Sequence, residues 1–427
     1  MSDGSDAPHA RAAAEALAAA YREEWTRVVA TLIRATADWD VAEEATADAF
    51  ERAARRWSID GVPDNPGAWL TTVARNRALD VLRRRGVEAG KVREWLAMDE
   101  LTGGRGFDDP GELVVTEPEW DDRLRLVFTC AHPALPMEAR VALTLRTVGG
   151  LDTAEIARAY FVPESTMAQR LVRAKRKIRH AAIPYRVPSP DELPERLGGV
   201  LAVLMLVHNE GYLASSGDRL LRLDLQEEAI RLARLVVELL PDADEARALL
   251  ALLLLQHARS AARVDADGEL VPLDEQDRAR WNPEEVAEGL ALLAAPPHGA
   301  IGPYRIQAEI QAVHARAGTA DQTDWPAIVA WYDALLAVTP SPVVELNRAV
   351  AYGLAGRTEL ALEELDRLAA SARLGDYHLL AAAQADLLRR SGRAEAAAAR
   401  YREAIRLAPT GPERRFLERR LAELDTA

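Results

Sequence analysis

Apolar residues recur at spacings of three and four along most of the chain, and this helical period constrains the fold more than any other feature. The chain is rich in Ala, Leu, Glu and Arg, which favour helices, and poor in the strict alternation that half-buried strands require. We therefore expect an all-α protein. Its 427 residues, at about 150 residues per domain, predict two to four domains that each bury a core of their own.

Two interruptions of the helical pattern divide the chain. Gly86–Pro118 is rich in Gly and acidic residues and is expected to be a flexible acidic linker. Ile183–Pro194 contains four prolines, which disfavour a helix and predict an extended spacer. The expected organisation is a first helical domain, the acidic linker, a second helical domain, the spacer and a large helical C-terminal region, at residues 10–86, 87–118, 119–182, 183–194 and 195–427.

Charge is distributed unevenly between the two halves. The chain has 53 basic and 67 acidic residues, a net charge of −14. Residues 1–186 hold 27 basic and 29 acidic residues, net −2, which leaves 26 and 38, net −12, for residues 187–427. Binding to nucleic acid depends on neutralising phosphates with Lys and Arg. A nucleic-acid partner therefore belongs to the first half.

Several classes of function and location are disfavoured. The single cysteine, Cys130, excludes an internal disulfide and a cysteine-rich zinc module, and it fits a reducing cytoplasm. No signal peptide is visible, and the most apolar stretch, Ala246–Ala258, is shorter than the roughly 20 residues of a membrane span. Cys130 and His132 lack further ligands at metal spacing, and no phosphate-binding glycine loop occurs. We expect a cytoplasmic protein without a membrane partner, metal or cofactor, and not an enzyme.

Leu151–Arg179 has the pattern of a helix-turn-helix. Asp152 or Thr153 caps a short helix, Tyr160–Pro163 forms the turn, and a second helix begins near Pro163. Residues 165–186 contain seven basic residues and no acid, as a helix that enters a major groove requires. The alternative is a helical hairpin with a merely solvated face, which is disfavoured because such faces usually mix charge signs. The apolar arc of the second helix is Met167, Leu171, Ala174 and Ile178, and the opposite arc is Ser165, Thr166, Gln169, Arg173 and Arg176.

The first helical domain carries two further patterns. Glu44, Asp48 and Glu51 form an acidic ridge opposite the apolar arc of the helix that ends near Trp57. This ridge either docks on a basic partner surface or is an ordinary exposed helix face with a Glu51–Arg55 pair. The residues alone favour the ordinary face. In Gly61–Arg85, Asp64 and Asn65 precede a helix whose Thr72, Asn76 and Arg83 point outward, flanked by Arg75. Arg77 falls on the apolar arc and is expected to pair with Asp80 or to snorkel.

These motifs, in this order, resemble an extracytoplasmic-function sigma factor of bacterial RNA polymerase. The resemblance rests on AEEATADAFERAARRW, NPGAWLTTVARNRALDVLRRR, an acidic linker, and TAEIA with VPESTMAQRLVRAKRKI, and covers residues 10–182. The remainder resembles the subgroup with a long tetratricopeptide-like extension, through NEGY at Asn209–Tyr212 and SPVVELNRAVA at Ser341–Ala351.

The resemblance implies a role for each motif. In the family, the helix matching Asp40–Trp57 docks on the clamp helices of the polymerase's largest subunit, so Glu44, Asp48 and Glu51 are the expected polymerase contacts. The segment matching Asp64–Arg85 opens the −10 promoter element and holds a flipped base of the melted strand, and the second helix of the helix-turn-helix reads the −35 element as duplex. The linker threads toward the RNA exit path. The expected DNA contacts are Asp64, Asn65, Arg75, Asn76 and Arg83 at the −10 element, Ser165, Thr166, Gln169, Arg170 and Arg173 at the −35 element, and Lys175, Arg176, Lys177 and Arg179 at phosphates.

A weak repeat runs through the C-terminal region. Gly392, Ala397, Tyr401 and Ala404, which Pro409 follows, have counterparts 36 residues earlier at Gly356, Ala361, Leu365 and Leu368. A third, partial copy fits Ala229, Ala233, Val236 and Pro241. The spacing resembles the tetratricopeptide repeat, although Ala-rich helices also produce chance matches.

The resemblance suggests that this acidic extension regulates the sigma domains in cis, through an intramolecular contact or through polymerase. It could also mask Arg170–Arg179 electrostatically. His208–Tyr212 is either a contact site for the sigma domains or a ligand, or a helix end that is capped at Gly211 with Tyr212 buried. General considerations favour the helix end. Asn347, Arg348 and Tyr352 either line a concave face or pack inside a hairpin.

The sequence therefore supports a promoter-specificity subunit of RNA polymerase. The alternative is a stand-alone helix-turn-helix regulator with a tetratricopeptide-like domain that senses a peptide. A third class, a repeat scaffold with a vestigial helix-turn-helix, is disfavoured by the basic run through Arg179.

Overall fold

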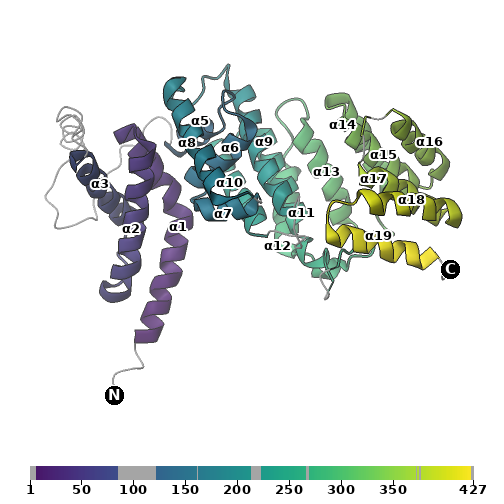
Figure 1. The fold of residues 1–427 in the computed structure, drawn as a ribbon, viewed down its shortest axis with the longest axis horizontal. Coiled ribbons are helices and arrows are strands. Elements are labelled where there is room, and N and C mark those ends of the chain that lie inside the picture. Colours follow the sequence, from purple (N-terminus) through teal and green to yellow (C-terminus); the bar gives the residue numbers. More distant parts are fainter. Residues whose placement is uncertain are drawn as a thin grey trace. The chain divides into compact units, whose positions relative to one another are not determined.

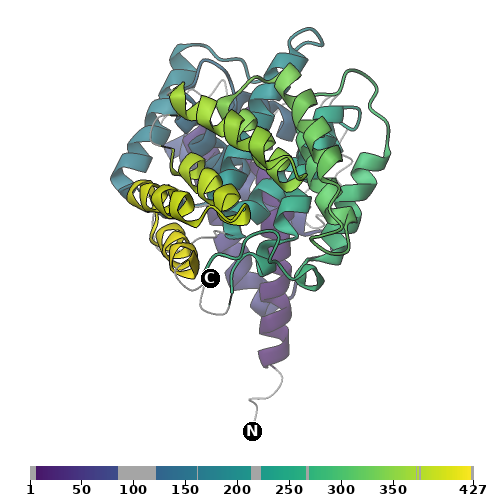
Figure 2. The same cartoon turned by 90° about the vertical axis from the view of Figure 1, so that its right-hand side faces the viewer.

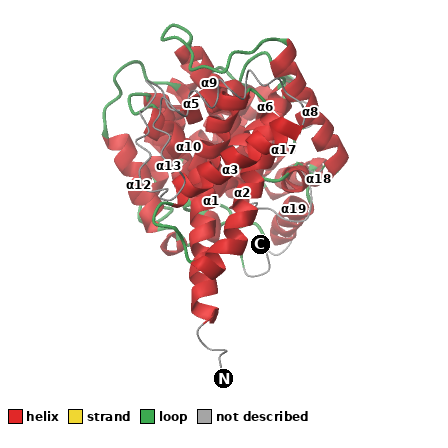
Figure 3. Cartoon of the chain, turned by 90° about the vertical axis from the view of Figure 1, so that its left-hand side faces the viewer, coloured by secondary structure: helices red, strands yellow, loops and turns green. Residues whose placement is uncertain are grey.

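Regular structure in this chain is helical. The computed structural model describes residues 6–84, 122–160, 162–212, 223–265, 269–371, 373–374 and 377–424. Within these ranges every element of secondary structure is a helix (Figure 3). The sole β-pairing among the described residues is an isolated bridge between Val264 and Leu270. The prediction of an all-α fold is confirmed. The predicted acidic linker at residues 87–118 lies outside the described residues. No helix within the described ranges is long and apolar enough to cross a membrane.

The chain forms two compact units, residues 1–203 and 204–427. The first unit begins with α1 (Asp6–Thr36), α2 (Trp39–Asp60) and α3 (Pro66–Arg84), which pack on one another (Figure 1). Asp38 starts α2 by accepting hydrogen bonds from the backbone N–H groups of Asp40 and Val41. The predicted apolar arc of α2 is buried, and a cluster of Tyr21, Trp25 and Phe50 joins α1 to α2.

The second half of this unit contains the helix-turn-helix. Its elements are α5 (Asp122–Cys130), α6 (Met137–Leu143), the π-helix η1 (Thr144–Val148), α7 (Thr153–Ala159) and α8 (Glu164–His180). At the start of α7, the backbone N–H of Asp152 donates to Glu155 and that of Glu155 donates to Asp152, at 2.7 and 2.6 Å. The four predicted apolar residues of α8 are all buried, so its opposite face is left for solvent or a partner.

The Pro-rich segment is packed and is not a free spacer. As expected, residues 183–192 are not helical. The next helix, α9 (Leu193–Tyr212), begins two residues before the predicted domain boundary at residue 195. Ile183 is buried, and the Tyr185 hydroxyl donates to the carbonyl of Ala30 at 3.1 Å. Arg196 in α9 donates to the carbonyl of Phe128 at 3.1 Å. These long-range contacts hold the segment on the first unit, and the division at residue 203 falls inside α9.

The second unit is a succession of helices, most of which pack on the helix that follows (Figure 2). Two short 3₁₀ helices, η2 (Ser260–Ala262) and η3 (Arg278–Arg280), lie between the first two α-helices and the rest. The α-helices are α10 (Leu223–Leu239), α11 (Asp244–His257), α12 (Pro283–Ala294), α13 (Pro303–Arg316), α14 (Trp325–Val338), α15 (Pro342–Leu354), α16 (Thr358–Ala370), α17 (His378–Arg390), α18 (Ala394–Leu407) and α19 (Gly411–Leu424).

The 36-residue repeat is present as a repeated hairpin turn. Gly356 and Gly392 both have positive φ, 81° and 74°, a conformation that glycine adopts without steric cost. The residue after each glycine donates its N–H to a backbone carbonyl five residues earlier, in both cases at 2.9 Å. The helices that follow bury the same three positions of the repeat. The third set, Ala229, Ala233 and Val236 in α10, is buried too.

Candidate nucleic-acid interface

The exposed face of α8 is the predicted DNA-reading face. Gln169 and Arg173 lie one turn apart on it, and the Arg173 guanidinium donates to the Gln169 amide oxygen at 3.3 Å. This face therefore presents amide and guanidinium groups of the kind that pair with base edges. Among the predicted DNA contacts on α8, Arg170 is half-buried, and the exposed ones are Ser165, Thr166, Gln169, Arg173, Arg176, Lys177 and Arg179.

Lys175 departs from the prediction. Its side chain is only 11% exposed, and its ammonium group lies 2.8 Å from Asp40 and 3.1 Å from Glu43 on α2. The predicted phosphate contact by Lys175 is wrong for this structure because the ammonium group is already paired inside the protein. The helical wheel places Lys175 at the border of the buried arc, but its partners lie more than 130 residues earlier in the sequence.

Glu43 is a functional candidate that the sequence reasoning missed. Its side chain is 6% exposed, and its carboxylate accepts hydrogen bonds from Arg146 at 3.1 Å and from the Thr147 hydroxyl at 3.0 Å. With Lys175, three donors surround this carboxylate, as a buried charge requires. One signal was available in the sequence: of the two acidic residues between Val41 and Ala45, Glu43 lies on the side of the buried arc of α2.

The loop before α3 and the outer face of α3 carry the candidate −10 contacts. Asp64 is exposed. Asn65 is exposed as well, but its side-chain oxygen accepts a hydrogen bond from the N–H of Ala68 at 3.0 Å, so it also starts α3. On α3 itself, Arg75 is half-buried, whereas Asn76 and Arg83 are exposed. The loop and these side chains thus belong to one short stretch of the first helical domain.

The acidic ridge on α2 is partly neutralised within the protein. Arg77 pairs with Glu44 at 3.1 Å and also with Asp48, so the predicted pairing of Arg77 with Asp80 is wrong. Glu51 pairs with Arg55 at 2.8 Å, as the ordinary-face interpretation expected. Exposed pairs of this kind contribute little to stability. Glu51 is exposed and can still meet a basic partner surface.

In the second unit, the candidate residues are engaged in internal packing. Arg348 pairs with Asp333 at 2.9 Å and with Glu364 at 3.1 Å, and its guanidinium lies 5.5 Å from the Tyr352 ring. This arrangement favours packing inside the hairpins over a free concave surface, although Asn347 is exposed. Helix α9 ends at Tyr212, within the stretch predicted as a helix end and one residue after the expected cap at Gly211.

His208, on α9, is completely buried. Burial, followed by electrostatic interactions with His257 and Arg263, lowers the pKa of His208 to about 3. The imidazole is therefore neutral at pH 7.

In the first unit, Cys130 is also completely buried, and burial raises the pKa of its thiol well above the ordinary value, which fits a role in the core.

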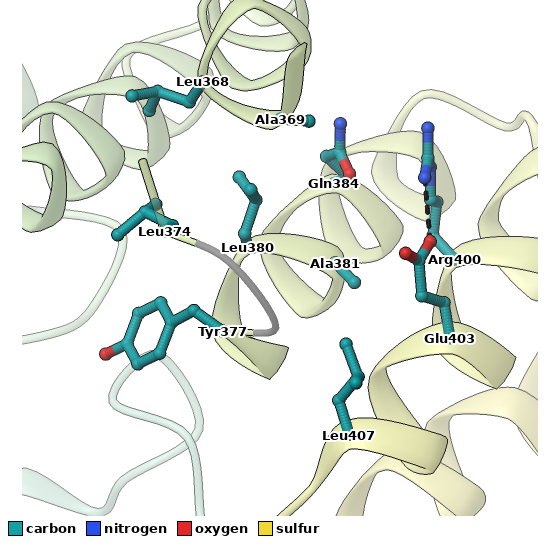
Figure 4. Close-up of a pocket in the computed structure, with 10 residues that line it drawn as sticks. All are labelled: Leu368, Ala369, Leu374, Tyr377, Leu380, Ala381, Gln384, Arg400, Glu403 and Leu407. Carbon is teal, nitrogen blue, oxygen red and sulfur yellow. Dashed lines mark hydrogen bonds and ion pairs between the residues drawn. The ribbon is translucent and has the colours of Figure 1, made fainter. Parts of the chain in front are cut away.

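A small pocket lies between α16, α17 and α18 (Figure 4). Its cavity volume is about 110 Å³. Leucine side chains and Tyr377 form much of the wall, and an Arg400–Glu403 ion pair at 2.8 Å lies at one side. Gln384 lines the pocket but donates to Asp366 at 2.6 Å. No cluster of His, Cys, Asp or Glu that could hold a metal ion occurs among the residues described.

Comparisons with known proteins match all three parts of the chain. Family models match residues 20–87 as Sigma-70 region 2, residues 125–178 as Sigma-70, region 4, and residues 196–296 as a family of unknown function, DUF6596. An uncharacterised protein of Rhizobium meliloti is 40% identical over 403 residues, which cover 93% of each chain.

Two relatives that are named as sigma factors match the first part of the chain. The ECF RNA polymerase sigma factor SigK of Mycobacterium ulcerans is 30% identical over 172 residues, 40% of this chain and 88% of the relative. The probable ECF RNA polymerase sigma factor SigI of Mycobacterium tuberculosis is 27% identical over 171 residues, 40% of this chain and 57% of the relative.

Proposed function

Because this chain belongs to the ECF family of RNA polymerase sigma factors and carries a large C-terminal helical extension, we propose that it directs core polymerase to promoters through both sigma domains, under control of the extension. The observation that carries this proposal is the exposed, acid-free basic face of α8 in a helix-turn-helix. Catalysis of RNA synthesis belongs to the polymerase, and the chain acts where the polymerase is, in the cytoplasm.

The two domains have separate tasks. The exposed face of α8 reads the −35 duplex with Gln169 and Arg173 and contacts phosphates with Arg176, Lys177 and Arg179. The loop at Asp64 and Asn65, with Arg75, Asn76 and Arg83, holds the melted strand at the −10 element. Neither domain alone carries much positive charge, so free protein binds a promoter weakly. Polymerase tethers both contacts and converts them into one avid interaction.

The extension is proposed to regulate the sigma domains in cis. Two observations support this role. The full-length relative from Rhizobium meliloti matches both the sigma domains and the extension in one chain. Residues 187–427 have a net charge of −12, opposite in sign to the basic face of α8. Because the Arg348 guanidinium already pairs with Asp333 and Glu364, we do not expect it to bind a peptide.

The acidic ridge offers a direct test of polymerase binding. Glu51→Arg is expected to weaken binding of the full chain to core polymerase about tenfold, because it replaces an exposed negative charge with a positive one on the surface proposed to meet the clamp helices. Binding is measured by pull-down of purified core polymerase at two salt concentrations. Asp60→Arg is the matched control, an exposed acidic residue at the end of the same helix, 3.9 Å from Arg56. It should bind like the original chain.

This pull-down also separates the proposed function from its alternative. A stand-alone DNA-binding regulator has no need of polymerase. If the original chain fails to retain core polymerase while it binds duplex DNA, the regulator becomes the better account, and the roles of Glu44, Asp48 and Glu51 are withdrawn. If Asp60→Arg weakens binding as much as Glu51→Arg, the ridge is not the docking site.

A further inference from the structure

The C-terminal helix α19 returns to the segment between η2 and η3 (Figure 1). Residues 269–275 of that segment carry three carboxylates and are called the acidic segment. We propose that arginines of α17 and α19 form a binding surface for acidic peptides, which the acidic segment occupies as an internal ligand. This inference goes beyond the proposed function, because it concerns the extension alone and does not depend on promoter recognition.

Each carboxylate of the acidic segment pairs with a different arginine, and two helices supply these arginines. The ion pairs are Glu269 with Arg415 at 2.6 Å, Asp274 with Arg390 at 2.5 Å, and Glu275 with Arg420. Together with Arg419, these three arginines are called the arginine surface. Glu269 and Arg415 are 146 positions apart, so the surface is a product of the fold and not of local sequence.

The backbone of the acidic segment is bound as well as its side chains. Arg419 donates to the carbonyl of Leu270 at 3.1 Å. The segment keeps its shape through bonds of its own: the N–H of Val271 donates to the carbonyl of Arg263 at 2.9 Å, and the Gln276 amide donates to the carbonyl of Val271 at 3.1 Å. The arginine surface therefore recognises a peptide chain and not only its charge.

Phe416 fixes the position of two of the guanidinium groups. Those of Arg419 and Arg420 lie 5.6 and 5.4 Å from the centre of its ring. The Arg420 side chain is in addition only 11% exposed. Stacking and partial burial restrict these side chains before any ligand arrives, which lowers the entropy that binding costs. The surface is thus preorganised for carboxylates.

The acidic segment neutralises charge that the two helices do not neutralise themselves. Arg390 also pairs with Asp386 of its own helix at 2.6 Å, and Arg420 with Glu423 at 2.9 Å. For Arg415 and Arg419, the polar partners that the structure describes belong to the acidic segment. If the segment leaves, both guanidinium groups lose these partners, and an acidic peptide is the ligand that replaces them.

The acidic segment is held by contacts that can be exchanged. In its ion pairs, the side chains of Arg415 and Arg390 are 53% and 36% exposed. Exposed ion pairs are individually weak and are screened by salt. The segment stays bound because it belongs to the same chain, which gives it a high effective concentration. A separate peptide with carboxylates at the same spacing can take its place once the internal contacts are weakened.

A synthetic peptide tests the arginine surface in the full chain. The probe is a fluorescent peptide with the sequence of residues 269–276, ELVPLDEQ, and its binding is measured by anisotropy. The original chain should bind it weakly, because the internal segment occupies the surface. A triple variant, Glu269→Gln with Asp274→Asn and Glu275→Gln, should bind it about tenfold more tightly. A peptide with the same three changes should bind neither chain.

Charge reversal on α19 gives the second arm of the test. Added to the triple variant, Arg415→Glu with Arg419→Glu should abolish the gain in peptide binding. Arg402→Glu with Arg406→Glu is the matched control, because both arginines are exposed on α18, outside the arginine surface. The proposal is overturned if the triple variant binds the peptide no more tightly than the original chain, or if the two reversed variants lose binding equally.

Hydrogen exchange shows whether the acidic segment leaves the surface while the unit stays folded. In the otherwise original chain, Arg415→Glu with Arg419→Glu should speed amide exchange in residues 269–275 about tenfold, whereas the core helix α11 keeps its rates. Unchanged exchange in the segment also overturns the proposal. If the peptide binds as expected but the chain starts no transcription with polymerase, the proposed function fails and the arginine surface stands.

Discussion

Replacement of both Gln169 and Arg173 by alanine is expected to reduce promoter-dependent initiation about 10- to 100-fold, which corresponds to about 1.4–2.8 kcal/mol. Both side chains are exposed on α8, and they touch each other at 3.3 Å, so each could compensate for the other in a single variant. The loss should appear as relaxed discrimination at the −35 element. It is measured by transcription from promoters that carry every single base change there.

Val172→Ala is the matched control for this prediction. Val172 lies on the same helix, next to Arg173, and is 63% exposed. Its apolar side chain can offer base edges no hydrogen bond. The control should initiate like the original chain, and the double variant should unfold at the same temperature because it loses only exposed side chains. Equal losses in the control and the double variant would show that α8 does not read bases through Gln169 and Arg173.

Acid is expected to destabilise the second unit steeply. His208 and His314 are both buried. Burial is the main cause of a pKa of about 3 for each, and His314 is further affected by the charges of Arg259 and Arg278. In the unfolded chain each histidine titrates near 6.5. Between these values the unfolded state binds more protons, so stability is lost as the pH falls below about 6.5, by about 2 kcal/mol per histidine at pH 5.

Hydrogen exchange measured by mass spectrometry can test this prediction within the second unit. Amides of α11 and α13 should exchange faster at pH 5 than at pH 7 after correction for the intrinsic pH dependence. The His314→Gln variant should lose about half of this acid sensitivity, because Gln does not titrate. His298→Gln, which changes an exposed histidine of the same unit, should retain it. Identical pH dependence in the two variants would contradict the assignment to buried histidines.

The helices and the exposed basic face of α8 could be predicted because both depend on local pattern. The apolar period of α8 fixes which side is buried, and Gln169 and Arg173 follow on the opposite side. The repeat turns were predictable for a similar reason, since Gly356 and Gly392 mark positions where the chain needs positive φ.

The contacts between distant segments could not be predicted in the same way. Glu43 and Lys175 are 132 positions apart, and no periodicity links them. Tyr185 was predicted to be part of a proline-rich spacer. Its hydroxyl instead donates a hydrogen bond to the carbonyl of Ala30 on α1, and burial raises the pKa of this hydroxyl far above the ordinary range. Arg77 was expected to pair with Asp80 on its own helix or to snorkel, whereas it pairs with Glu44 and Asp48 of α2.

The most direct test of the account is transcription in vitro by core polymerase with the purified full chain and, in parallel, a chain that ends at Tyr212. This end point keeps α9 whole, because Arg196 on α9 binds the first unit. The account predicts that the full chain starts RNA synthesis at a defined distance from a −35 and −10 pair, and that the shorter chain differs in output because the extension regulates it. Equal output would remove the regulatory role. Binding of duplex DNA without initiation by either chain would contradict the sigma function itself.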